Sequence, residues 1–135
     1  VHVVTLLEEM PTQETIDGVA ELQAAGLPVG AVLVNMVREP LLRGAELQAA
    51  GKGTLDRPEV ESGVSAAGLS GHPGLVGALL DEAADHAERV RLQRSERRQL
   101  KSLGQPTLEL PWLADGADLS GLYRLAATLR TAGVR

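Results

Sequence analysis

Asn35 is the polar residue best suited to recognise a ligand, and it follows an apolar run that begins at Val29. A carboxamide offers one acceptor and two donors, and this set matches an adenine edge by accepting from N6 and donating to N7. The alternative is that Asn35 ends a strand by bonding to local backbone groups. A second candidate is Pro111-Trp112-Leu113, which forms either an apolar slot for a flat ring or a cover for the edge of a sheet. Spacing alone favours the simpler alternative for both.

Phosphate-binding and metal-binding patterns are absent from the sequence. The Gly-Lys pair at Gly51-Lys52 is followed by Gly53 instead of Ser or Thr, so it cannot cradle phosphates and magnesium. The chain has no Cys, which excludes a disulfide framework, a thiolate zinc site and a cysteine nucleophile. The histidines and hydroxyl side chains have no spacing typical of a catalytic triad. We therefore predict no metal site and no nucleotide hydrolysis by this chain alone.

Alternating strands and helices must position these candidates. The first part of the chain predicts a strand, a helix that opens at Pro11 with Thr12 as its cap, and a second strand: Val1–Leu7, Gln13–Gly26 and Val29–Val37. Asn35 lies near the end of that second strand. A connection this short that contains a helix predicts two parallel strands in a right-handed βαβ unit.

The remaining elements continue the same pattern after an interruption. A Gly/Pro-rich insertion at about 38–74 predicts one short helix, Leu41–Ala50, and then a mobile surface segment, Gly51–Gly74. Beyond it we predict a long helix, a third strand and a last helix: Leu75–Leu103, Thr107–Leu110 and Asp118–Ala132. In the last helix, the inward side chains are predicted to be Leu119, Leu122, Leu125, Ala126 and Leu129.

This order predicts an α/β fold with a partial parallel sheet and flanking helices. Ligands of open α/β sheets bind beyond the carboxyl ends of the strands. The loops at 7–12, 35–40 and 111–118 are expected to converge there, so Asn35 and Trp112 are predicted to face a shared crevice.

Composition limits the classes of protein that fit. The chain has 135 residues, which is about one domain, and its net charge of −5 disfavours a nucleic-acid-coating protein. No apolar run is long enough to span a bilayer and no signal peptide is visible, so we expect a cytoplasmic protein. The sequence begins without Met and within a predicted buried strand, so we expect a fragment of a longer protein.

Two segments resemble the C-terminal half of a known ATPase family. The stretch VVTLLEEMPTQETIDGVAELQAAGLPVGAVLVNMV resembles the arsenical-pump and tail-anchored-protein-targeting ATPases, which are also called anion-transporting ATPases. The residues that carry this resemblance are Thr5, Glu8, Pro11, Glu14-Thr15, Gly26, Val29 and Val34-Asn35. The stretch LELPWLADGADLSGLYRLAATL is similar to the adenine loop and final helix of that family.

The resemblance implies the C-terminal portion of a Rossmann-like P-loop NTPase of the deviant Walker A class. It implies ATP as the ligand, with Mg held mainly by an N-terminal half, and an adenine site made by Asn35, Pro111, Trp112 and Leu113. It assigns no catalytic residue here, and Glu8 and Glu14 would position other groups. It further implies ATP hydrolysis coupled to a protein client or transport partner, in a homodimer or a paired homologous subunit. The fragment alone is expected to be inactive.

The chain departs from that family in one chemical respect. The family often has a Cys-x-x-Cys pair that holds a shared zinc, and this chain lacks Cys. A zinc-stapled dimer is therefore not available to it, and the arsenical-pump role gains no support because arsenite capture needs soft thiolates.

Two alternatives to an enzyme half remain open. The chain could be a non-hydrolysing interaction subunit. It could also bind anionic lipid, as a peripheral membrane partner, or RNA through the basic helix face at 89–101, where Arg91, Arg94, Arg98 and Lys101 align. The simpler interpretation of that face is a solvated surface, because cations at a helix C-terminus need no ligand.

Overall fold

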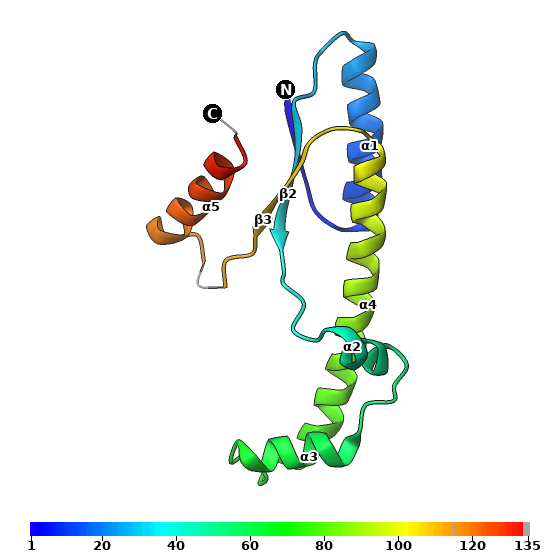
Figure 1. Ribbon diagram of the computed structural model, residues 1–135, viewed down its shortest axis with the longest axis vertical. Coiled ribbons are helices and arrows are strands. Elements are labelled where there is room, and N and C mark those ends of the chain that lie inside the picture. Colours follow the sequence, from blue (N-terminus) through cyan, green and yellow to red (C-terminus); the bar gives the residue numbers. More distant parts are fainter. Residues whose placement is uncertain (115, 134–135) are drawn as a thin grey trace. The chain divides into compact units, whose positions relative to one another are not determined.

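The structure is a computed structural model that describes residues 1–114 and 116–133. The chain divides into two compact units, of which the first combines Val1–Glu39 with Leu92–Arg135 and the second is Pro40–Arg91. Helix α4 (Leu75–Ser102) contributes its first part to the second unit and its last turns to the first. The order of the elements can be followed in Figure 1.

The first unit is built on a parallel sheet of three strands. These strands are β1 (His2–Thr5), β2 (Ala31–Val37) and β3 (Thr107–Pro111), with β2 in the centre. Val3 lies opposite Val32, and Leu33 lies opposite Leu108. The helices of this unit are α1 (Glu9–Ala24), the end of α4, and α5 (Leu119–Thr131). The predicted α/β fold with a partial parallel sheet and flanking helices is confirmed.

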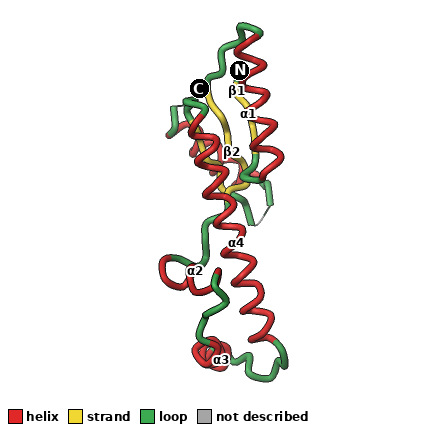
Figure 2. Tube along the Cα trace, turned by 90° about the vertical axis from the view of Figure 1, so that its right-hand side faces the viewer, coloured by secondary structure: helices red, strands yellow, loops and turns green. Residues whose placement is uncertain are grey.

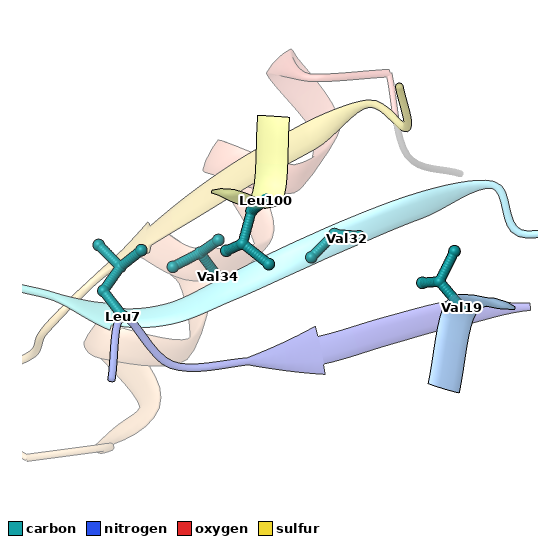
Figure 3. Packing of buried hydrophobic residues seen from close by; sticks show 5 residues of the cluster. All are labelled: Leu7, Val19, Val32, Val34 and Leu100. Atoms are coloured by element: carbon teal, nitrogen blue, oxygen red, sulfur yellow. The ribbon is translucent and has the colours of Figure 1, made fainter. Parts of the chain in front are cut away.

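The core of the first unit lies between the sheet and two helices on one face. Both crossovers, through α1 and through α4, advance in the same direction across the sheet. Right-handed crossovers that advance in one direction bring their helices to the same face. Val19 of α1 and Leu100 of α4 accordingly form one buried cluster with Leu7, Val32 and Val34 (Figure 3).

The opposite face of the sheet is covered less completely. Helix α5 lies on that side, beside β3 (Figure 1). Val4 of β1 points away from the core and keeps 63% of its surface exposed. The prediction that Leu119 and Leu122 of α5 point inward is wrong, since they are 69% and 52% exposed. The same prediction is wrong for Ala126, which is exposed, whereas Leu125 and Leu129 are partly buried. A sheet of three strands is too narrow to bury the whole apolar stripe of α5.

The start of α1 differs from its prediction. The helix begins at Glu9, not near Gln13, and Thr12 does not cap it, because the backbone N–H of Thr12 already donates to the carbonyl of Glu8 at 3.0 Å. Pro11 is tolerated in the first turn, where its missing N–H has no partner to lose. The helix therefore starts before the proline. Its predicted end is confirmed by Gly26, which has a φ of 75°.

Buried threonines fix the turn between β1 and α1. The Thr5 hydroxyl donates to the carbonyl of Pro11 at 3.0 Å, and the Thr15 hydroxyl donates to the same carbonyl at 2.8 Å. Thr5, Thr12 and Thr15 are all buried. The threonines of the first resembling segment therefore have a structural explanation, since they tie the end of β1 to the first turns of α1.

The second unit is helical. It contains α2 (Gly44–Gly51), α3 (Arg57–Ala66) and the first part of α4, and its core joins Leu47 and Ala50 to Ala87 and Val90. The prediction of an irregular segment at 51–74 is wrong, because α3 occupies Arg57–Ala66 (Figure 2). Pro58 stands in its first turn, where proline favours a helix start. Within the described ranges, no helix has the length and apolar character to cross a membrane.

Candidate functional site

The carboxyl ends of the parallel strands form the edge where the candidate residues were predicted to meet. Pro111 of β3 is the register partner of Val37 of β2. One step further, the backbone N–H of Trp112 donates to the carbonyl of Val37 at 2.8 Å. The loop that follows β3 is therefore anchored to the end of β2, the strand that carries Asn35.

A β-bulge interrupts β2 at this edge. Val34 pairs with Glu109 and Val37 pairs with Pro111, so Asn35 and Met36 together stand opposite a single residue of β3. Met36 has a φ of 57°, a left-handed conformation that non-glycine residues seldom adopt. Bulges and strained residues of this kind concentrate next to binding sites, where they redirect side chains.

Asn35 keeps its hydrogen-bonding capacity. Strand alternation puts it with Leu33 on the face opposite Val32, that is, on the side of α5. Its side chain is half-buried, and no hydrogen bond joins its carboxamide to another described residue. The simpler alternative, a bond to local backbone, is thus not observed, and the donors and acceptor of Asn35 remain available.

Trp112 is in contact with a cation. The guanidinium carbon of Arg38 lies 3.9 Å from the centroid of the Trp112 ring, a stacked cation–π arrangement. Trp112 is 38% exposed, so it does not simply seal the edge of the sheet. A positive charge covers part of the ring, so the face of Trp112 that Arg38 contacts is not an open apolar surface. The predicted slot for a flat ring at Pro111-Trp112-Leu113 stays a prediction. Sequence reasoning missed Arg38, although its place directly after the second strand was visible.

The rest of the adenine-loop candidate is locked to α5. The Asp118 carboxylate caps α5 by accepting from the backbone N–H of Gly121 at 2.7 Å. Gly121 is buried, and a Cβ at that position would lie 2.7 Å from Cδ1 of Leu113. Leu113 therefore packs against the first turn of α5, while Pro111 ends β3. Of the three predicted loop residues, only Trp112 is exposed, while Pro111 and Leu113 are partly buried.

The carboxylates Glu8 and Glu14 lie at the start of α1 and are exposed. No side-chain hydrogen bond or ion pair joins either of them to another residue that the structure describes. Their predicted positioning role stays a prediction. Over residues 1–114 and 116–133, no group of three His, Asp or Glu side chains is arranged to hold a metal ion.

The basic residues of α4 are partly neutralised. Within the second unit, Arg89 pairs with Glu82 at 2.5 Å and Arg91 pairs with Glu88 at 3.5 Å. Within the first unit, Arg97 binds both carboxylate oxygens of Glu109 on β3, at 2.7 and 3.0 Å. Exposed residues of the predicted stripe in that unit are Arg94, Arg98 and Lys101. Lipid or RNA binding by this stripe stays a prediction.

Known proteins are similar in sequence to this chain along its whole length. No protein-family model matches it. All 135 residues align with "ATPase BagA" of Mycobacterium tuberculosis and with "Putative ATPase Mb3704" of Mycobacterium bovis, at 38% identity in each case. The chain spans about 40% of the length of these relatives. This similarity supports an ATPase family, and the arsenical-pump subtype rests on the sequence resemblance alone.

Proposed function

We propose that this chain is the adenine-side part of an ATP-binding, ATP-hydrolysing ATPase. The similarity to proteins named ATPase, at 38% identity over all 135 residues, supports the general class. The observation that carries the adenine assignment is the end of β2, where Asn35 has a carboxamide without a bonding partner among the described residues. The exposed Trp112 is tied to the same strand end by its backbone bond to Val37.

These two side chains fit a purine base. The Asn35 carboxamide can accept from adenine N6 and donate to N7. An exposed indole ring is a stacking platform for a flat base, and such stacking contributes about 1–3 kcal/mol. Leu113 holds the loop in place by packing on α5 at Gly121. In the proposed site, Asn35 selects the base edge and Trp112 supports its plane.

The proposal does not assign the binding of the phosphates and Mg to residues of this chain. A bound Mg ion would supply charge neutralisation at the phosphates, and the sequence of this chain contains no Gly-rich, Lys-containing loop to hold either group. We therefore assign hydrolysis to the part of the relatives that lies outside the matched 40% of their length. Pairing with a homologous subunit and coupling to a client or transport partner are further parts of this proposal. They rest on the resemblance.

The test uses a chimera in which this chain replaces its matched segment of ATPase BagA. Asn35→Ala is expected to weaken ATP binding about 5- to 140-fold, because a bidentate base contact contributes about 1–3 kcal/mol. Gln23→Ala, which removes an exposed carboxamide on α1, is the matched control and should leave the affinity unchanged. Circular dichroism verifies that each variant is folded.

Two results would count against the proposal. If Asn35→Ala leaves the dissociation constant for ATP unchanged, Asn35 is not part of the binding site. A folded chimera that binds no ATP, under conditions in which BagA itself binds it, rejects the ATPase assignment and favours the non-hydrolysing interaction subunit.

A further inference from the structure

The stack of Arg38 on Trp112 bears on how a base would reach the ring. Arg38 follows Val37 directly, and the carbonyl of Val37 accepts a hydrogen bond from the backbone N–H of Trp112. The side chains of Arg38 and Trp112 therefore start from neighbouring strand ends. The distance of 3.9 Å between the guanidinium carbon and the ring centroid is van der Waals contact. No flat ring fits between them, so a base that stacks on this face of Trp112 must first displace Arg38.

The hold on Arg38 is weak. Arg38 is exposed, and no ion pair or hydrogen bond joins its guanidinium to another residue in the described part of the chain. The contact with Trp112 is the interaction that retains it. A cation–π contact at an exposed site changes an equilibrium about two- to five-fold, whereas stacking of a base on an aromatic ring contributes about 5- to 140-fold. Base stacking is therefore the stronger of the two contacts with the ring, so a base at sufficient concentration displaces Arg38.

We propose that Arg38 is a removable cover on the base-binding face of Trp112 and sets the affinity of that face for a purine. The inference rests on the proposed adenine site and deepens it. In the ligand-free chain, the guanidinium of Arg38 lies on one face of the Trp112 ring. A purine base takes its place, and the observed affinity is reduced by the factor that the Arg38 contact contributes. Removing the guanidinium should thus strengthen base binding, the opposite of what an ordinary contact residue does.

Trp112 makes the test direct, because it is the single tryptophan of the chain. The first measurement, without ligand, is acrylamide quenching of Trp112 fluorescence in the 135-residue chain. Arg38→Gln should increase the quenching constant, since the ring loses its cover. Arg124→Gln, which removes an exposed positive charge from α5, is the matched control and should leave the constant unchanged. Equal quenching in wild type and Arg38→Gln overturns the proposal.

The second measurement titrates adenosine and follows the same fluorescence. Adenosine lacks phosphates, so the loss of one positive charge has no electrostatic effect on it. Arg38→Gln is expected to tighten adenosine binding about two- to five-fold, and Arg124→Gln to leave it unchanged. Unchanged or weaker binding in Arg38→Gln overturns the role of Arg38 while the adenine site stands. Absence of any adenosine response in either protein overturns both.

Discussion

Gly121 is the position at which the candidate loop can be displaced most selectively. A Cβ added there would lie 2.7 Å from Cδ1 of Leu113 and 3.1 Å from the backbone carbonyl oxygen of Gly116. The leucine can rotate away, but the carbonyl oxygen moves only with the loop. Overpacking of this kind costs about 1–3 kcal/mol, while replacing a helical glycine by alanine contributes about 1 kcal/mol of stability. Gly121→Ala should therefore destabilise the first unit by up to about 2 kcal/mol.

Gly18 provides the matched control for that substitution. It lies within α1, and a Cβ at Gly18 would meet no atom within 4 Å beyond its chain neighbours and the nearby backbone of its own helix. Gly18→Ala therefore gains the helix propensity without the clash and is expected to stabilise the same unit by about 1 kcal/mol. The assay is urea unfolding followed by Trp112 fluorescence, which reports the unit that contains both glycines.

Leu113→Ala separates the two sources of the clash. In that background, Gly121→Ala keeps the contact with Gly116 but loses the contact with Leu113, so its cost should fall. The expected coupling free energy is at least about 0.5 kcal/mol, as for other side chains in direct contact. The reasoning is refuted if Gly121→Ala stabilises the protein as much as Gly18→Ala does.

Two further substitutions test local features of the fold. Thr15→Val removes a buried hydroxyl that donates to Pro11 and should cost about 1 kcal/mol in the same urea assay, whereas Thr128→Val, which removes a similar but solvent-exposed bond within α5, should cost less. Equal losses would contradict the role of burial. Met36→Val should cost at least about 1 kcal/mol, because a β-branched residue resists the left-handed backbone, and Met36→Gly should not destabilise. A Met36→Val variant as stable as wild type would contradict the bulge geometry.

Regular elements were the predictable part of this fold. The apolar run around Val32 predicts a strand buried on the helix side, and the glycine at position 26 predicts the end of α1, where the structure has a positive φ. Both signals are local, because they depend on hydrophobic periodicity and on a backbone conformation that glycine adopts at low cost. The parallel arrangement followed from the short connection between the first two strands.

Features that depend on competition between local signals were harder to predict. Thr12 has the residue type of a helix cap, yet Pro11 is compatible with the first turn and the helix begins earlier, at Glu9. Gly63 weighs against a helix by its propensity, yet α3 runs through it. The single-residue preferences involved are each about 1 kcal/mol, which is too small to decide between two permitted conformations.

The candidate site was only partly predictable. Asn35 was identified by its type and by its place near the end of a strand. The bulge at Met36 has no sequence signature, because no glycine marks its positive φ. The contact between Arg38 and Trp112 joins residues far apart in the chain, and it arises only because parallel strands bring both ends to one edge.

The direction in which the strands follow one another has a consequence for any longer protein that contains this chain. Both crossovers advance in the same direction across the sheet, so their helices cover one face of it, while Val4 stays 63% exposed on the other. A chain that adds strands beyond β1 and covers Val4 with the helices of right-handed crossovers must add those strands in the opposite direction across the sheet. Doubly wound sheets bind their ligands at the point of this reversal, beyond the strand ends. Such an extension would create that point next to the carboxyl end of β1, where Thr5 and Thr15 already hold the turn through the carbonyl of Pro11.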